Sequence, residues 1–330
     1  MAVDIVTGGA GFIGSHLVDR ILAGTNNRVR VIDNFSSGSP RNLEHLKGDP
    51  RLEVVELDLS DFAAVKGAFE GAGSVFHLAA LADIVPSIER PVEYMSTNVQ
   101  GTVRVLECAR HAGIGKLVYA ASSSCYGLAA TPTREDHPIA PQYPYALSKY
   151  LGELAVLHWG QVYHLPVNSI RIFNAYGPRV RTTGAYGAVF GVFFKQKLEG
   201  RPFTVVGDGT QKRDFVFATD VAEAFLLAAQ TSKMGQVWNL GGGRPQSVNR
   251  LAELLGGPVV RIPKRPGEPE ITWADITKIT RDLGWRPRVT FEEGVARMMA
   301  EIESWRDAPL WDPESIARAT KTWFEFLGAE

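Results

Sequence analysis

Near its amino terminus the chain reads Thr7-Gly8-Gly9-Ala10-Gly11-Phe12-Ile13-Gly14, directly after the apolar run at residues 3–6. The apolar run predicts a buried β-strand, and the residues after the glycines predict a helix that begins near residue 12. Glycines at such a junction permit a tight turn and let the backbone approach a pyrophosphate, which the amino terminus of the helix can bind. The spacing of Gly8, Gly11 and Gly14 differs from the standard fingerprint, but its position between strand and helix predicts a dinucleotide site.

The same alternation of short apolar runs and longer amphipathic segments continues through the first half of the chain. It is typical of a parallel sheet wrapped by helices, so we expect an α/β fold with a Rossmann-like doubly wound parallel sheet. The expected strands lie near residues 3–7, 28–33, 52–56, 74–78, 116–121 and 167–173, and the expected helices near 12–23, 60–70, 91–112 and 144–163.

After about residue 175 the alternation loosens, and Gly- and Pro-rich stretches separate shorter elements. We therefore expect a Rossmann-like dinucleotide-binding domain over residues 1–174 and a smaller C-terminal α/β domain, for the substrate, mainly over residues 175–330. Segments near 219–240 again resemble a helix and a strand, and we expect them to return to the large sheet.

The composition excludes several classes of protein. The 330 residues are 45% hydrophobic, and 35 basic residues nearly balance 36 acidic ones without a basic block, which argues against binding to nucleic acid or an anionic membrane. Two cysteines, Cys108 and Cys125, are too few for a disulfide framework or a zinc site, so we expect no metal and a reducing compartment. The chain has neither a signal-peptide core at its start nor a run of eighteen apolar residues, and we expect a cytoplasmic location.

Acidic residues at the ends of the second and third expected strands indicate the kind of dinucleotide. Asp33 lies nineteen residues after Gly14, where a carboxylate can accept hydrogen bonds from the ribose hydroxyls of the adenosine. The same carboxylate would repel a 2′-phosphate, which favours NAD over NADP, although Arg41 nearby leaves NADP open. Asp58 follows the third strand and could reach the adenine amino group, but an isolated Asp there is also a common helix cap.

A candidate chemical centre lies at the start of the helix expected over residues 144–163. Tyr145 and Lys149 are four residues apart and share a helix face. A phenol has an unperturbed pKa of about 10, and a nearby ammonium and an oxidised nicotinamide both favour the phenolate that base catalysis needs. A serine cluster that begins at Ser122 ends the fifth strand, at the sheet edge where such folds bind ligands. Tyr-x-x-x-Lys alone is common by chance, but together with the serine cluster at the same sheet edge it predicts catalysis.

The motifs together resemble the extended short-chain dehydrogenases/reductases over nearly the whole chain. The resemblance rests on the glycine turn, the serine cluster before Tyr126, the Tyr145 and Lys149 pair, and the run Arg171-Ile172-Phe173-Asn174-Ala175-Tyr176-Gly177-Pro178. Within that family the chain resembles most the UDP-galactose and UDP-N-acetylglucosamine 4-epimerases. Dehydratase relatives carry an Asp-Glu pair where this chain has Ser123-Ser124, so the resemblance does not favour dehydration.

The resemblance implies a reaction in two halves with no net redox change. Tyr145 takes the proton of the sugar 4-hydroxyl while NAD accepts hydride from C4, the 4-keto sugar turns over, and hydride returns to its other face. Lys149 anchors the nicotinamide ribose and assists electrostatically, and Ser122 is the hydroxyl partner of the sugar. By the same resemblance the NAD site comprises Gly8, Gly11, Phe12, Ile13, Gly14, Asp33, Asn34, Ser37, Gly38, Asp58, Leu59, Leu78, Ala79, Ala80, Asn98, Ala120, Tyr145, Lys149 and Phe173.

Residues in the second half resemble the family's contacts to a nucleoside diphosphate. Two guanidiniums, Arg213 and Arg265, can clamp a diphosphate, and the Glu268 carboxylate can accept from ribose hydroxyls. The full substrate set that the resemblance implies is Ser87, Ser122, Ser123, Ser124, Asn174, Arg181, Val189, Thr204, Val206, Arg213, Arg265, Glu268 and Thr272.

The sequence does not determine which sugar the protein binds. Thr272 matches a position where 4-epimerases restricted to plain hexoses tend to have a bulky aromatic residue, so we expect room for a 2-N-acetyl group. Arg181 matches a carboxylate-binding arginine of UDP-glucuronate 4-epimerases, whereas Asn174 stands where those enzymes tend to have threonine. Asp83 departs from the small or uncharged residue usual near the sugar and has no assigned role.

Three other interpretations stay open. One is an epimerase of UDP-glucuronate or of another nucleotide's sugar, with the same chemistry. Another is a catalytically silent NAD-binding sensor or structural subunit, against which the intact Ser122, Tyr145 and Lys149 set argues. The third is an NADP-dependent reductase, which Asp33 disfavours. The helices near 91–112 and 144–163 resemble those that pair across a two-fold axis in this family, so we expect a homodimer.

Overall fold

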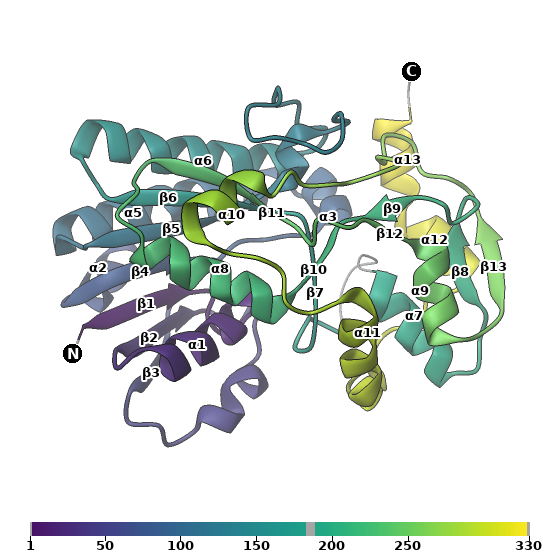
Figure 1. Cartoon of the computed structure of the whole chain (residues 1–330), viewed down its shortest axis with the longest axis horizontal. Coiled ribbons are helices and arrows are strands. Elements are labelled where there is room, and N and C mark those ends of the chain that lie inside the picture. Colours follow the sequence, from purple (N-terminus) through teal and green to yellow (C-terminus); the bar gives the residue numbers. More distant parts are fainter. Residues whose placement is uncertain (1, 183–188, 329–330) are drawn as a thin grey trace.

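The computed structural model describes residues 2–182 and 189–328. Its centre is a parallel sheet of seven strands in the order β11-β6-β5-β4-β1-β2-β3 (Figure 1). The strand order reverses direction between β1 and β4, as in a doubly wound Rossmann-like fold, so the predicted fold class is confirmed. The strands are β1 (Val3–Thr7), β2 (Arg28–Asp33), β3 (Leu52–Glu56), β4 (Ala72–His77), β5 (Lys116–Ser122), β6 (Val167–Ile172) and β11 (Gln236–Leu240).

Helices cover both faces of this sheet (Figure 1). One face carries α1 (Phe12–Gly24), α8 (Ala218–Gln230) and α10 (Thr277–Leu283), and the other carries α2 (Phe62–Ala68), α5 (Gly101–Ala112) and α6 (Pro144–Tyr163). Leu17 of α1 and Phe225 of α8 belong to one buried core, whereas Val105 of α5 and Val156 of α6 belong to a second. Burying each such side chain stabilises the folded state by about 1.5–3 kcal/mol. This packing holds the helices against the sheet and so fixes the sheet edge where the candidate site lies.

The helix predicted over residues 91–112 consists of three consecutive pieces. They are α4 (Pro91–Met95), the π-helical turn η2 (Ser96–Gln100) and α5. Other short helices of the first half are η1 (Pro40–Leu46), α3 (Ile84–Glu89) and η3 (Ser123–Tyr126). A π-helical turn adds a residue to one helical turn and is frequent at functional sites. Here it directs the buried Asn98 amide toward the loop after β4 and toward α6.

Helix α6 begins at Pro144 and ends at Tyr163, as the sequence predicts. Proline suits the first helical position because its missing N–H would have no partner there. His164 ends the helix in the left-handed conformation. This start fixes the positions of Tyr145 and Lys149 in the first turns, next to the carboxyl end of β5.

The second part of the molecule has its own core (Figure 1). Three two-stranded sheets pair β7 with β10, β8 with β13 and β9 with β12. Aromatic side chains fill the space between them, among them Phe190, Phe203, Phe291 and Trp305. The elements are β7 (Asn174–Tyr176), α7 (Val189–Leu198), β8 (Phe203–Val206), β9 (Lys212–Arg213), β10 (Phe215–Phe217), β12 (Gln246–Ser247), α9 (Val248–Leu255), β13 (Val259–Ile262), α11 (Phe291–Ala300), η4 (Ile302–Trp305), α12 (Pro313–Ala319) and α13 (Lys321–Leu327).

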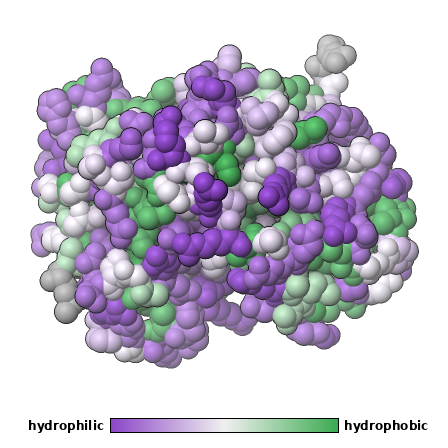
Figure 2. All heavy atoms as spheres, viewed as in Figure 1, coloured by the Kyte–Doolittle hydropathy of each residue, from purple (hydrophilic) through white to green (hydrophobic). Residues whose placement is uncertain are grey.

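Hydrophilic residues cover much of the face seen in Figure 2, with hydrophobic residues scattered among them. Among residues 2–182 and 189–328 there is no helix with the length and apolar character that a bilayer span requires. Scattered exposed apolar residues are normal on a folded protein and need no partner to explain them.

Candidate active site

The turn between β1 and α1 fits a dinucleotide pyrophosphate. Gly8 has a φ of +71°, and a Cβ there would lie 2.6 Å from the backbone nitrogen of Ala79. A Cβ at Gly14 would overlap the carbonyl oxygen of Gly8, so α1 packs directly on the turn. The helix starts after Gly11 without a side-chain cap and without an acidic residue in its first turn. Its first N–H groups and its dipole therefore suit an anion.

Asp33 ends β2 beside this turn and ties it to the next loop. One carboxylate oxygen accepts a hydrogen bond from the backbone N–H of Ala10 at 2.9 Å, and the other accepts from Phe35 at 2.9 Å. Burial raises the pKa of Asp33, whereas these hydrogen bonds act in the opposite direction. Asn34 links the loop to the end of β3 by donating to Asp58 at 2.7 Å. These residues fit the adenosine half of NAD.

The other predicted NAD residues of this half lie around the same loops. Gly38 is packed so close to Asp33 that a Cβ would lie 3.0 Å from the carboxylate oxygens. Ser37 is exposed beside Gly38, and Leu59 is partly buried against the core under α5. Phe12 and Ile13 form the first turn of α1.

A buried histidine fixes the loop that follows β4. His77 is bonded to the Thr7 hydroxyl at 2.7 Å and to the Thr102 hydroxyl at 2.9 Å. Burial lowers the pKa of His77 to about 3, so the ring is neutral at ordinary pH. The ring thus connects β1, β4 and α5 directly beneath residues 78–80, which the sequence places in the NAD site.

Asn98 supports this loop from the side. Its amide accepts from the backbone N–H of Leu81 at 2.8 Å and donates to the Leu81 carbonyl at 2.9 Å and to Ser148 at 2.9 Å. Asn98, which is predicted to contact NAD, thus also joins the loop after β4 to the helix that carries Tyr145.

The candidate catalytic residues meet where β5 and α6 approach each other. Ser122, 8% exposed, is in hydrogen-bonding contact with the Tyr145 phenol. Burial raises the pKa of Tyr145, the hydrogen bond with Ser122 lowers it, and the Asp83 carboxylate raises it. Lys149, 4% exposed, lies one turn further along α6 with its Nζ 4.4 Å from the centre of the Tyr119 ring. Burial lowers the pKa of Lys149 to about 7, against the charge of Glu153, which raises it.

The rest of the serine cluster lies on η3. The Ser122 hydroxyl donates to Ser124 at 3.0 Å, and the backbone N–H of Ser124 returns a bond to Ser122 at 3.2 Å. Ser123 is partly exposed beside them. Ala120 is buried in β5, and Phe173 lies at the end of β6 with its ring centre 6.3 Å from that of Tyr126.

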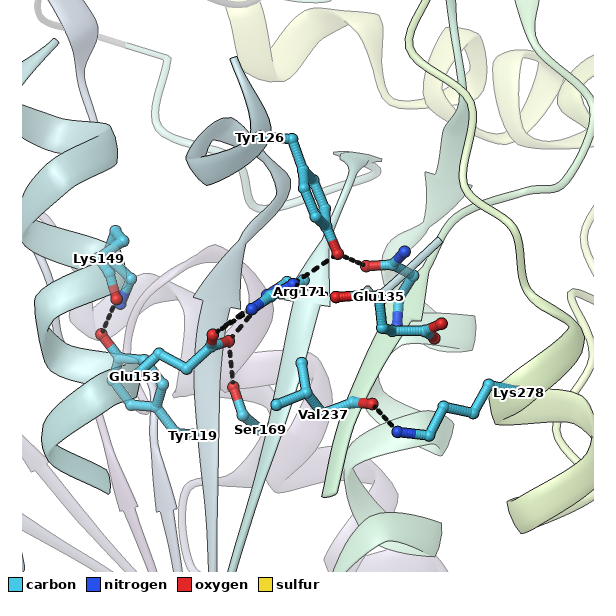
Figure 3. A network of polar contacts seen from close by, with 10 residues as sticks. Tyr119, Tyr126, Glu135, Lys149, Glu153, Ser169, Arg171, Val237 and Lys278 are labelled. Atoms are coloured by element: carbon cyan, nitrogen blue, oxygen red, sulfur yellow. Dashed lines mark hydrogen bonds and ion pairs between the residues drawn. The ribbon is translucent and has the colours of Figure 1, made fainter. Parts of the chain in front are cut away.

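A buried ion pair links α6 to β6 (Figure 3). Glu153 lies one turn after Lys149, is 1% exposed, and binds Arg171 of β6 with a shortest contact of 2.6 Å. Ser169 donates to the same carboxylate at 2.9 Å, and Arg171 donates to the Tyr126 hydroxyl at 2.7 Å. Glu153 lies four residues after Lys149, and this spacing is the sequence signal from which its influence on the pKa of Lys149 could be predicted.

The predicted diphosphate residues also meet. Arg213 donates to Glu268 at 2.6 Å, and Arg265 approaches the other oxygen of the same carboxylate at 3.7 Å. Arg213 and Glu268 line a cavity of about 220 Å³ that also reaches Val206 and Gln211. The guanidiniums of Arg213 and Arg265 can bind a phosphate ester, and the cavity wall also carries Lys264 and the carboxylates of Asp208 and Glu270.

Asn174 and Thr272 lie beside this cluster. The Thr272 hydroxyl donates to the Asn174 side-chain oxygen at 2.6 Å and accepts from the backbone N–H of Asp214 at 3.2 Å. This pair therefore brings together two residues that the sequence assigned to the substrate from positions about a hundred residues apart.

Four other predicted substrate residues have mainly structural contacts. Ser87 is fully buried and donates to the Ile84 carbonyl at 2.6 Å. Thr204 is buried and bonded to Gln196, and Val189 packs into the core of the second part. Val206 packs in a small apolar cluster and contributes to the cavity wall.

Asp83 and Arg181 lie on the catalytic side. Asp83 begins α3, and the Tyr94 hydroxyl contacts its backbone. The Tyr94 ring stands edge-on to Tyr145, with ring centres 6.5 Å apart. Burial raises the pKa of Asp83, and the charge of the exposed Arg181 acts against that rise.

Known proteins are similar to this chain over most of its length. Residues 5–241 match the model of the NAD dependent epimerase/dehydratase family. A UDP-glucose 4-epimerase of Mycolicibacterium smegmatis is 37% identical over 303 residues, which cover 89% of this chain and 96% of that protein. Sugar-nucleotide dehydratases are also among the matching proteins.

Solved structures of similar proteins also match most of this chain. A UDP-N-acetylglucosamine 4-epimerase of Methanobrevibacter ruminantium in complex with UDP-N-acetylmuramic acid has a TM-score of 0.85 and 31% identity, over 91% of this chain and 99% of that one. A UDP-glucuronic acid 4-epimerase of Bacillus cereus, in complex with UDP-glucuronic acid and NAD, has a TM-score of 0.84 and 30% identity, over 92% and 99%.

Proposed function

Since the chain belongs to the NAD dependent epimerase/dehydratase family, and is therefore an NAD-dependent enzyme, we propose that it interconverts the C4 epimers of a nucleoside-diphosphate sugar. The substrates we propose are UDP-N-acetylglucosamine and UDP-glucose, with UDP-N-acetylgalactosamine and UDP-galactose as products. The contact of Ser122 with Tyr145, one helical turn from the buried Lys149, is the observation that carries this proposal.

Different residues of the chain bind the parts of NAD. NAD, when bound, supplies an acceptor and donor of hydride. Gly8, Gly14 and the start of α1 hold its pyrophosphate, and Asp33 accepts from its adenosine ribose. Lys149, with a pKa of about 7, binds the nicotinamide ribose and supplies positive charge close to Tyr145.

Tyr145 moves the proton at the sugar. In the first half reaction its phenolate accepts the proton of the 4-hydroxyl, and in the second half it returns a proton to the 4-keto oxygen. Ser122 donates a hydrogen bond to the same oxygen and keeps Tyr145 oriented. Because a 4-keto sugar that turns over can be reduced on either face, the net reaction is epimerisation.

The nucleotide of the substrate binds in the second part of the molecule, in the cavity lined by Arg213 and Glu268. Arg213 and Arg265 bind the diphosphate, and Glu268, released from the two arginines, accepts from ribose hydroxyls. Thr272 is small and its hydroxyl is held by Asn174, which leaves room beside the sugar for an N-acetyl group.

A hexuronate is the second candidate substrate, because Arg181 could bind a C6 carboxylate. The neighbouring Asp83 carboxylate argues against it, since it already faces the Arg181 charge and would repel a second carboxylate close to Tyr145. Dehydration is disfavoured because Ser123 and Ser124 lack the acid and base that it requires.

The assembly and the location belong to the same proposal. We propose a cytoplasmic homodimer that pairs through α5 and α6, with an NAD-binding domain over residues 1–174 and a substrate domain mainly over residues 175–330. Light scattering after size exclusion tests the dimer, and a monomer at micromolar concentration contradicts it.

The proposed reaction can be tested without any added reductant. Purified enzyme is incubated separately with UDP-N-acetylglucosamine, UDP-glucose and UDP-glucuronate, and the anomeric protons are followed by NMR. We expect conversion of the first two, and a loss of about 10²–10⁴-fold in rate for Tyr145→Phe. Tyr163→Phe, at an exposed position of the same helix, is the matched control and should be unchanged. Conversion of UDP-glucuronate alone would assign the reaction to the hexuronate.

A further inference from the structure

Helix α13 directs one large aromatic side chain inward. Trp323 is 6% exposed, whereas Phe324 and Phe326 on the same helix are 39% and 63% exposed. The indole N–H of Trp323 donates to the carbonyl of Pro266 at 2.8 Å. The Arg265 guanidinium carbon lies 5.8 Å from the indole ring centre. Trp323 therefore contacts the loop that carries the proposed diphosphate residues.

The indole also lies close to the start of α6. The ring centres of Trp323 and Tyr143 are 6.2 Å apart. Tyr143 in turn is stacked on Tyr145, with ring centres 6.4 Å apart and planes 8° from parallel. Ser124 is hydrogen-bonded to the Tyr143 phenol, and the charges of Glu268 and Arg213 act on it. A continuous aromatic row thus connects Arg265 with the proposed base.

The same helix is attached to both parts of the molecule. The Thr322 hydroxyl donates to Glu89 at the end of α3 at 3.2 Å, and α13 packs along α3. Figure 1 shows α13 near the C-terminus, beyond the small strands of the second part.

We propose that Trp323 is a positioning residue that orients Arg265 and the loop at 264–268 for binding of a nucleoside diphosphate. A guanidinium that rests on an aromatic face keeps its in-plane N–H groups available, whereas one held only by carboxylates does not. The indole N–H fixes the Pro266 carbonyl, directly before Gly267, whose φ is +66°. This inference rests on the proposed function, because it takes the diphosphate of that substrate as the ligand.

The test uses the NAD-loaded enzyme and three variants. Trp323→Leu removes both the aromatic face and the N–H donor, Trp323→Phe removes only the donor, and Phe326→Ala is the control on the exposed side of α13. UDP binding is measured by titration calorimetry, and KM and kcat are measured for the converted sugar. We expect Trp323→Leu to weaken UDP binding and raise KM about tenfold, Trp323→Phe about threefold, and kcat to change less than threefold in each.

Equal UDP affinity and KM in Trp323→Leu and the parent enzyme would overturn the inference and leave the proposed function standing. A fall in kcat without a change in KM would also overturn it, because it would assign Trp323 to the catalytic step. If Trp323→Leu does not fold, Trp323→Phe decides, and parental binding by it is the contrary result. If the parent enzyme binds neither UDP nor dTDP nor GDP, the proposed function itself fails, and the inference with it.

Discussion

At Tyr145 the protein alone does not favour the phenolate. Burial and the nearby Asp83 both raise the pKa of the phenol, and only the hydrogen bond with Ser122 acts in the other direction. We expect the positive charge of the oxidised nicotinamide, added to that of protonated Lys149, to lower this pKa, so that bound NAD favours the phenolate. The site is in this sense activated by its own cofactor, which agrees with a cofactor that stays bound through the reaction.

The neutral His77 predicts how stability depends on pH. Its folded pKa of about 3 lies below the ordinary value of 6.5, so unfolding takes up a proton between these values. The stabilising contribution is complete above pH 6.5 and is lost as pH falls toward 3, by at most about 1.4 kcal/mol per pH unit.

Urea unfolding of the parent and of His77→Asn at pH 7, 6 and 5 measures this contribution. The variant should be less stable at pH 7, because it loses the bonds to Thr7 and Thr102, and its stability should fall less steeply on acidification. Parallel pH dependences for the two proteins would contradict a buried neutral histidine.

At the scale of elements, the contact of α1 with the glycine turn predicts retention of NAD. Gly14→Ala places a Cβ on the Gly8 carbonyl, which pushes the start of α1 away from the pyrophosphate. We expect the purified variant to carry less than about a tenth of the parental NAD, since several N–H contacts to the phosphates are lost together.

Gly67→Ala is the matched control for this change. Gly67 lies inside α2, and a Cβ there has nothing within 4 Å. The substitution should leave the NAD content unchanged and stabilise the protein by about 0.5–1 kcal/mol. The NAD content is measured by absorbance of the acid extract. Full NAD occupancy of Gly14→Ala would contradict the prediction.

The buried pair between α6 and β6 predicts a shift in the pH profile. Glu153→Gln removes a negative charge that raises the pKa of Lys149, so that pKa should fall below about 7. If protonated Lys149 supports catalysis, the loss of kcat at alkaline pH should begin at a lower pH. The variant should also lose about 3–5 kcal/mol of stability, because the Arg171 charge is left buried and unpaired.

Glu107→Gln serves as the comparison, since Glu107 pairs with Arg110 at the surface of α5. An exposed pair contributes less than about 1 kcal/mol, and its removal should not affect the pH profile. An unchanged alkaline limb in a folded Glu153→Gln enzyme would show that this carboxylate does not act on Lys149.

The elements, and the closeness of Tyr145 to Lys149 on one helix, could be predicted because their signals are local. The glycine turn is contiguous, Tyr145 and Lys149 are one turn apart, and Pro144 begins α6 as its residue type demands. Asn98 illustrates the opposite case, because its hydrogen bonds reach Leu81 and Ser148, and no local pattern reveals which of its contacts are made.

At the scale of the whole molecule, the site depends on contacts between distant segments. Arg213 and Glu268 lie 55 residues apart, and Asn174 and Thr272 lie 98 apart, yet each pair is in direct contact. The resemblance named these residues, but not their pairing. It gave no role to Trp323, whose place beside Arg265 and Tyr143 follows only from the fold.

The fold also gives a reason for the two-part design. Tyr145 and Lys149 lie on α6, beside the carboxyl end of β5, whereas the proposed diphosphate residues come from the second part. A substrate that binds both parts brings its sugar C4 to the catalytic edge while its nucleotide stays in the cavity. We therefore propose that the enzyme oxidises and then reduces the same carbon, C4, with Tyr145 as the base.

One isotope experiment tests that claim most directly. UDP-N-acetylglucosamine with deuterium at C4 of the sugar is incubated with the NAD-loaded enzyme in ordinary water, and the epimer is analysed by NMR and mass spectrometry. The account predicts UDP-N-acetylgalactosamine that retains the deuterium at C4, because the hydrogen that leaves C4 returns to the same carbon. An epimer that carries solvent hydrogen at C4 would contradict the account, because it would show that the enzyme removes this hydrogen as a proton.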